Sequence, residues 1–143
     1  MARRYPKKSS LVALLCSAAI SVYPISSDAL SQQNASFDAC MNDAAGVSSE
    51  MLACGKAEIS LWDARLNKAY AFLLIRLSPS ETKRLRNDQR KWLELHNSEI
   101  RRLAENPENG SSAFLESQAF ELEDLSQRVL MLESRAINDR SVK

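Results

Sequence analysis

The sequence predicts an all-α protein, an antiparallel three-helix bundle with a short N-terminal helix that is pinned by a disulfide. Three observations lead to this prediction. Glycine is scarce, with three in 143 residues. No alternating apolar and polar run bounded by turn residues indicates a strand. Apolar residues instead recur at three- to five-residue intervals, which places them on one face of a helix, and three such segments joined by short loops favour an antiparallel bundle.

Residues 1–29 have the features of a secretory signal peptide. Residues 1–10 carry four basic residues and no acid, and residues 11–22 are apolar or small. Ser27-Asp28-Ala29 has the small-x-small form of a signal-peptidase site, so cleavage is expected after Ala29. The alternative is an uncleaved membrane anchor, but the apolar stretch is shorter than the roughly 20 residues that span a bilayer. We therefore expect a periplasmic or secreted single domain, residues 30–143, without a membrane segment after cleavage.

The charge balance of this mature chain argues against nucleic-acid binding. The signal contains four of the 19 Lys and Arg residues and one of the 18 Asp and Glu residues, which leaves 15 basic and 17 acidic residues and a net charge of −2. Nucleic-acid-binding proteins depend on a pronounced basic excess to attract phosphates. No nucleic-acid partner is therefore expected.

Two cysteines remain in the mature chain, Cys40 and Cys54. An even pair in an oxidising compartment predicts a disulfide, and closing a loop of about 15 residues contributes roughly 3 kcal/mol in the chain-entropy treatment. A two-cysteine metal site is the alternative, but the only histidine is His96 and no Cys-x2-Cys is present. We expect no metal and no cofactor.

The N-terminal half of the mature chain is predicted to contain a short helix and a long one. Residues 30–36 are expected to be a polar leader, and residues 37–45 a short helix or turn that carries Cys40. Ser48 and Ser49 are candidate N-caps of a helix that ends near residue 77. Its apolar face comprises Met51, Cys54, Ile59, Trp62, Leu66, Tyr70, Leu73 and Leu77.

Two further helices complete the predicted bundle. Ser78-Pro79-Ser80-Glu81 has the residues of a capping box with proline at the first helical position. This helix is expected to continue to about residue 105, because Asn106 precedes a proline and so avoids the helical region. Residues 108–112 are expected to form a loop, residues 113–137 a helix, and residues 138–143 a frayed tail. The last helix has an apolar stripe of Leu122, Leu125, Val129, Leu132 and Ala136.

Many residues of these helices follow one fixed pattern: Cys40, Ser48, Met51, Cys54, Glu58, Asp63, Leu66, Asn67, Tyr70, Leu85, Gln89, Arg90 and Trp92. With this spacing the chain resembles the LprI N-terminal-domain family, small exported bacterial proteins named after a lysozyme inhibitor, over about residues 40–103. The resemblance implies a binding protein whose partner is a lysozyme. The family's second cysteine pair is missing, and we expect a contact between Ile100 and Phe120 in its place. The family's Arg-Asp dipeptide is His96-Asn97 here.

Seven residues at these positions form the candidate binding site or structural polar network: Glu58, Asp63, Asn67, Tyr70, Gln89, Arg90 and Trp92. One interpretation is a shared polar site that meets a ligand or a partner. The other, which we favour from sequence, is a buried network joining Asn67 or Asp63 to Gln89 or Arg90, because buried polar groups need partners. Exposure of Gln89, Arg90 and Trp92 separates the two.

No catalytic residue is predicted. Glu58 and Asp63 are five residues apart, so they do not share a helix face well, and the chain has no nucleophile elbow or glycine-rich phosphate loop. His96 is expected to be a solvated histidine or one at the edge of the core. The protein is therefore not expected to be an enzyme.

A candidate acidic partner face comes from Glu121, Glu123 and Asp124. Lysozymes are often strongly basic, so an acidic face would steer association with such a partner and occlude its cleft. The alternative is that these acids only complement the seven basic residues within residues 83–102 on a neighbouring antiparallel helix. The predicted function is that of an exported binding protein, and the family resemblance implies that it is a lysozyme inhibitor. The alternative is a cell-envelope accessory or structural module that binds another envelope protein or a peptidoglycan fragment. The sequence does not indicate an oligomeric state.

Overall fold

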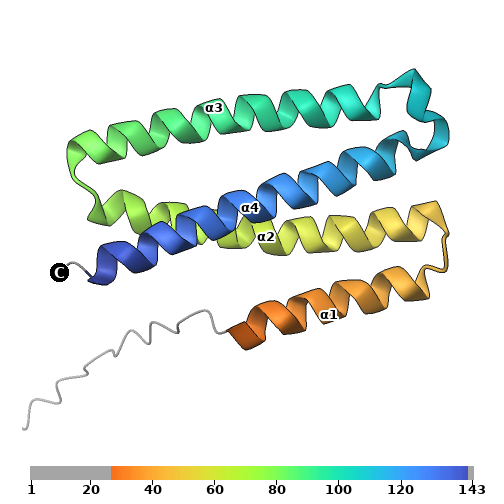
Figure 1. Cartoon of the computed structure of the whole chain (residues 1–143), viewed down its shortest axis with the longest axis horizontal. Helices are drawn as coiled ribbons and strands as arrows, with labels where there is room; N and C mark the ends of the chain where they lie inside the picture. Colours follow the sequence, from red (N-terminus) through yellow and green to blue (C-terminus); the bar gives the residue numbers. More distant parts are fainter. Residues whose placement is uncertain (1–26, 142–143) are drawn as a thin grey trace, which may run out of the picture.

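The computed structural model describes the backbone of residues 27–141 and the side chains of residues 33–139 (Figure 1). This part of the chain is all-α and contains no strand, as predicted. It consists of α1 (Ser27–Asp43), α2 (Ser48–Arg76), α3 (Pro79–Ala104), the short 3-10 helix η1 (Pro107–Ser112) and α4 (Ala113–Ser141). None of the described helices is sufficiently long and apolar to span a membrane. Residues 1–26 of the predicted signal peptide lie outside the described residues, so the signal peptide stays a prediction.

The three long helices lie side by side and run in alternating directions (Figure 1). A tight turn at Leu77 and Ser78 reverses the chain between α2 and α3, and η1 reverses it again before α4. α4 packs against both α2 and α3, whereas α1 packs against α2. α4 thus makes most of the contacts that hold the three long helices together.

The start of α3 has the predicted capping box. The Ser78 hydroxyl accepts a hydrogen bond from the backbone N–H of Glu81, and the Glu81 carboxylate accepts one from the backbone N–H of Ser78 at 3.0 Å. Pro79 occupies the first helical position, where no N–H is needed. The hydrogen bonds from the side chain and backbone of Ser78 lower the pKa of the Glu81 carboxyl from its ordinary value.

Several predicted boundaries are wrong. The predicted polar leader at residues 30–36 is helical and belongs to α1, and the predicted loop at residues 108–112 lies within η1. The expected frayed tail is helical as far as Ser141, and Arg76 forms an ion pair with Asp139 there at 3.1 Å. These segments are polar, so their local sequence resembles a loop, while contacts with α2 stabilise the helical form of α1 and of the end of α4.

The predicted serine caps of α2 are also wrong. Val47 occupies the N-cap position, without a side-chain cap, and its carbonyl accepts hydrogen bonds from the backbone of Glu50 and Met51. Ala45 and Gly46 just before it have positive φ angles of 48° and 82°. This turn reverses the chain, so α2 begins at Ser48 and the serines lie inside its first turn.

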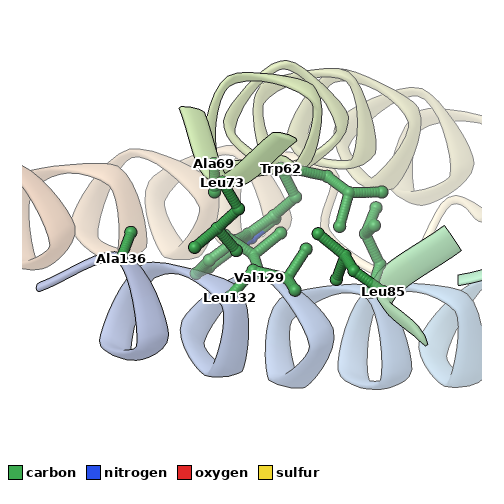
Figure 2. Packing of buried hydrophobic residues seen from close by; sticks show 9 residues of the cluster. Trp62, Ala69, Leu73, Leu85, Val129, Leu132 and Ala136 are labelled. Atoms are coloured by element: carbon green, nitrogen blue, oxygen red, sulfur yellow. The ribbon is translucent and has the colours of Figure 1, made fainter. Parts of the chain in front are cut away.

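The apolar core lies mainly between α2 and α4. Figure 2 shows Trp62, Ala69 and Leu73 of α2 pointing toward Val129, Leu132 and Ala136 of α4. Leu66 and Leu125 belong to the same buried cluster, and α3 contributes the buried Leu85 and the partly buried Trp92, which packs against it. Fully burying a leucine side chain contributes about 1.5–3 kcal/mol, so this seam holds much of the stability. The predicted apolar stripe of the last helix is confirmed, with Leu122 partly buried at its start.

The predicted disulfide between Cys40 and Cys54 is confirmed and joins α1 to the start of α2. The two Cα atoms are 5.9 Å apart, within the usual range for this bond. Gly55 follows in α2, where the side chain of Gln118 from α4 occupies the space that a Cβ would need. The Gln118 amide donates to the carbonyl of Leu52 at 2.9 Å. Glycine therefore allows α2 and α4 to approach closely at this end.

Candidate functional site

An open groove of about 670 Å³ lies between α2 and α3. The α2 wall is formed by Asp63, Leu66, Asn67 and Tyr70, and the α3 wall by Arg86, Gln89, Arg90 and Leu93. We call this surface the α2–α3 groove. Five of the seven candidate residues from the sequence analysis line it, because the turn at Ser78 brings matching positions of the two helices opposite each other.

The groove is exposed along its rim and closed at its floor. Leu66 and Gln89 are buried, whereas Asp63, Asn67 and Arg90 are exposed. Within the described part of the chain, the side chains of Asp63 and Asn67 make no hydrogen bond, and Arg90 donates only to Asn87 on its own helix. The rim therefore presents polar groups to solvent that the fold does not use.

The predicted hydrogen bonds between the two walls, from Asn67 or Asp63 to Gln89 or Arg90, are not the ones that form. Gln89 does not bond to Asn67 or Asp63; its side-chain oxygen accepts two hydrogen bonds from Arg128 of α4, at 2.9 and 2.7 Å. Burial lowers the pKa of the Arg128 guanidinium from its ordinary value. Arg128 was not among the predicted site residues, although its position in the sequence is informative. Arg128 lies three residues after Leu125 and four before Leu132, inside the apolar stripe, where a cation requires a partner.

Trp92 and His96 form the next part of the contact between α3 and α4. Their rings stack with centroids 4.7 Å apart, and the guanidinium of Arg128 lies over the Trp92 ring at 5.6 Å. His96 Nδ1 is 2.6 Å from an oxygen of Asp124. His96 was expected to be either solvated or at the edge of the core. The first expectation is wrong, because His96 is buried. Trp92 is partly buried, and among the described residues its indole N–H has no hydrogen-bond partner.

The three residues of the candidate acidic face lie in different surroundings. Asp124 is bound to His96, and Glu121 is partly buried. Burial raises the pKa of the Glu121 carboxyl, His96 opposes this shift and Asp63 adds to it. Glu123 is exposed and accepts a hydrogen bond from Gln127 at 3.2 Å. Of these three residues, only Glu123 is thus exposed rather than partly buried.

Glu58 lies away from the groove, on the side of α2 that faces α1. It is buried and accepts a hydrogen bond from Gln33. Gln33 in turn accepts one from Arg65, which binds Glu133 of α4 through two bonds of 3.1 and 2.7 Å. This chain of bonds connects α1, α2 and α4, so Glu58 serves the fold. Glu58 and Asp63 lie in different environments, one buried beside α1 and one exposed on the groove.

The position of the missing second cysteine pair is occupied by other links between α3 and α4. The hydroxyl of Ser117 donates to the carbonyl of Ile100 at 2.8 Å. The ring of Phe120 lies 6.1 Å from that of His96, centroid to centroid. The direct contact between Ile100 and Phe120 stays a prediction. A hydrogen bond and a contact between two rings therefore join the two helices where the resemblance implied a covalent bridge.

The chemistry of the groove suits binding. One wall supplies guanidinium donors, and the other supplies a carboxylate, an amide and a phenol. Among the described residues, no group of three or more histidine, cysteine, aspartate or glutamate side chains has the arrangement of a metal site.

Comparison with known proteins gives one match. The family model described as lysozyme inhibitor LprI matches residues 40–135, about two thirds of the chain. The match extends beyond the residues that first suggested the family and includes most of α4. A search of curated proteins and a search of solved structures each found no match. The matched region contains both walls of the α2–α3 groove, the disulfide and the polar contacts between α3 and α4, and the chain belongs to the lysozyme inhibitor LprI family.

Proposed function

We propose that this protein is an exported, non-enzymatic binding protein that inhibits a lysozyme through the α2–α3 groove. Family membership supports an inhibitor whose partner is a protein. The observation that carries the proposal is the convergence of Asp63, Asn67, Tyr70, Gln89 and Arg90 on one open groove. These residues come from two helices and belong to the pattern by which the family was first suggested.

Burial and bonding distinguish a binding role from a purely structural one. A network that serves only the fold would be buried and satisfied internally. Of the three residues whose exposure was to separate these roles, Gln89 fits that description, because it is buried and bound to Arg128, and Trp92 is partly buried, whereas Arg90 is exposed. Asp63 and Asn67 do not fit it, because they are exposed without hydrogen bonds inside the described part of the chain. Their polar atoms remain available to a partner.

The groove is also well suited to rigid recognition. Both walls are long helices, and in this proposal α2, α3 and α4 act as one bundle that keeps the walls at a fixed separation. A preorganised surface loses little conformational entropy on binding, which favours affinity. Inhibition then requires no chemistry, since a protein that occupies the substrate cleft of a lysozyme excludes peptidoglycan from it.

The test is turbidimetric lysis of peptidoglycan by lysozyme, with and without oxidised protein of residues 30–143. We expect dose-dependent protection, and we expect Asp63→Ala with Asn67→Ala to weaken it about tenfold or more, which corresponds to roughly 1.4 kcal/mol. The matched control is Asp38→Ala with Asn42→Ala. This pair has the same residue types and the same spacing, is exposed, and lies on α1.

The result that would contradict the proposal is equally direct. Two lysozymes of different fold should be assayed, each with a large molar excess of the protein. Lysis at the full rate in both would exclude direct inhibition of these enzymes. Equal weakening by the α2 pair and the α1 pair would exclude the groove as the binding surface.

A further inference from the structure

Two arginines of the groove form a distinct feature of its α3 wall. Arg86 and Arg90 both line the groove and both are exposed. They are four residues apart, so their Cβ atoms lie about 5–6 Å apart on one helix face. Their guanidinium groups therefore reach the same region of the groove.

These arginines lack the carboxylate partners that other arginines of the fold have. Arg65 pairs with Glu133, Arg76 with Asp139, and Arg102 with Glu99. Within the described part of the chain, neither Arg86 nor Arg90 forms an ion pair. Arg90 uses one N–H for the side chain of Asn87, which leaves most of its five donors available.

A guanidinium group has a specific chemical preference. Its planar fork of N–H donors matches a carboxylate or a phosphate in two parallel hydrogen bonds. Two such forks one helical turn apart match a pair of carboxylates at a similar separation. The surface is therefore complementary to a partner that displays two neighbouring carboxylates.

Glycoside hydrolases carry such a pair in their clefts. Their two catalytic carboxyl groups are about 5–5.5 Å apart in retaining enzymes and about 6.5–9.5 Å apart in inverting ones, and lysozyme is among the enzymes that use two such groups. We propose that Arg86 and Arg90 bind these two carboxyl groups in the cleft of the inhibited lysozyme. This inference rests on the proposed function and assigns the contact within it.

Binding through the two arginines differs physically from binding through the candidate acidic face. An acidic face would act by long-range attraction to a basic enzyme, whereas the arginines would act by short-range pairing inside the cleft. The carboxylate of Asp124 is already bound to His96, and of the three acids only Glu123 is exposed rather than partly buried. The arginine wall is thus the stronger of the two candidate contacts.

The experiment compares three double variants of the oxidised protein. Arg86→Gln with Arg90→Gln removes both guanidinium groups of the groove. Arg84→Gln with Lys91→Gln removes the same charge from exposed positions of α3 that do not line the groove. Arg86→Lys with Arg90→Lys keeps the charge but loses the forks. Lysozyme affinity is measured by calorimetry and inhibition by turbidimetry, with circular dichroism to verify the helical fold.

We expect Arg86→Gln with Arg90→Gln to weaken lysozyme binding by about 30-fold or more, because removing one partner of a buried charge pair leaves the other charge unpaired. The control pair should stay within about twofold, and the lysine pair should fall between them. A lysozyme whose two catalytic carboxylic acids are replaced by amides should bind the wild-type protein more weakly by a comparable factor.

If the Arg86→Gln, Arg90→Gln variant and the Arg84→Gln, Lys91→Gln control bound lysozyme with equal affinity, the proposed arginine contact would be overturned. Undiminished binding to the amide-substituted enzyme would overturn it as well. In both cases wild-type inhibition would persist, so the proposed function would stand. Absence of wild-type inhibition would instead overturn the proposed function and this contact with it.

Discussion

The two helix–helix interfaces of α4, which we call seams, are built differently. The seam with α2 is apolar, and Trp62, Leu66 and Leu73 pack against Leu125, Val129 and Leu132 there. The seam with α3 is mostly polar. It includes the Gln89–Arg128 bonds, the His96–Asp124 contact and the bond from Ser117 to the carbonyl of Ile100. Its apolar part includes the buried Leu85 and the partly buried Trp92.

The two seams contribute to the fold in different ways. Apolar burial is nondirectional and supplies most of the free energy of folding. Hydrogen bonds contribute only about 0.5–1.5 kcal/mol each, but they specify which side chains meet. The polar seam thus fixes the register of α3 on α4, and α3 keeps its remaining polar side chains for the groove and for solvent.

The largest effect is expected in the apolar seam. Leu73→Ala removes a side chain with 0% exposure, and the lost burial and the resulting cavity should cost about 2–5 kcal/mol. The measurement is the free energy of unfolding from chemical denaturation. Leu61→Ala is the control, because Leu61 is 53% exposed and lies on the same helix. Similar losses for both variants would show that the seam between α2 and α4 is not the stabilising one.

A smaller effect is expected in the polar seam. Gln89→Ala leaves the partly buried guanidinium of Arg128 without its acceptor, which should cost about 1–3 kcal/mol. Replacing both partners, as Gln89→Met with Arg128→Met, should recover much of that loss, since apolar replacements of a buried polar pair are often close to neutral. A double variant less stable than Gln89→Ala would indicate that the bond itself is a major source of stability.

The smallest effect concerns Glu121, beside the polar seam. Burial raises the pKa of its carboxyl, so the charged form is disfavoured in the folded state and stability falls as pH rises through this pKa. Glu121→Gln should therefore stabilise the protein at pH 7, by less than about 1 kcal/mol because solvent screens a partly exposed group. The gain in stability should vanish at pH values below the pKa of this carboxyl in the unfolded chain, which is about 4.3. Thermal unfolding between pH 3 and pH 7 measures it.

Glu123→Gln is the control for this comparison, because Glu123 is exposed on the same helix. It should change the melting temperature little at any pH in that range. A Glu121→Gln variant that is less stable than wild type at pH 7 would contradict the assigned burial cost. In that case the attraction between Glu121 and His96 would outweigh it.

Local patterns were sufficient to predict much of the fold. The capping box at Ser78 and the apolar stripe from Leu125 to Ala136 depend on neighbours within one helix, so the sequence contains the whole signal. The helical state of residues 30–36 was not predictable in this way. That segment belongs to α1, which packs against α2, and its Gln33 donates a hydrogen bond to Glu58, 25 residues away.

In the candidate site, too, features set by local sequence were predictable and features set by distant contacts were not. Five of the seven candidate residues line the groove, because spacing along two helices fixes which faces converge, whereas Glu58 and Trp92 lie elsewhere. The groove residue Arg86 was not predicted as a site residue. The partner of Gln89 was missed, since Arg128 is 39 residues away. Local periodicity places a residue on a face, but the choice among polar partners on that face depends on how α3 and α4 pack in three dimensions.

The most direct test of the account is an NMR titration of isotope-labelled, oxidised protein with lysozyme. If the α2–α3 groove is the binding surface, the largest chemical-shift changes will lie at Asn67, Tyr70, Arg86 and Arg90, with little change along α1. Changes concentrated around Glu123 of α4 or along α1, with the groove unperturbed, would contradict it.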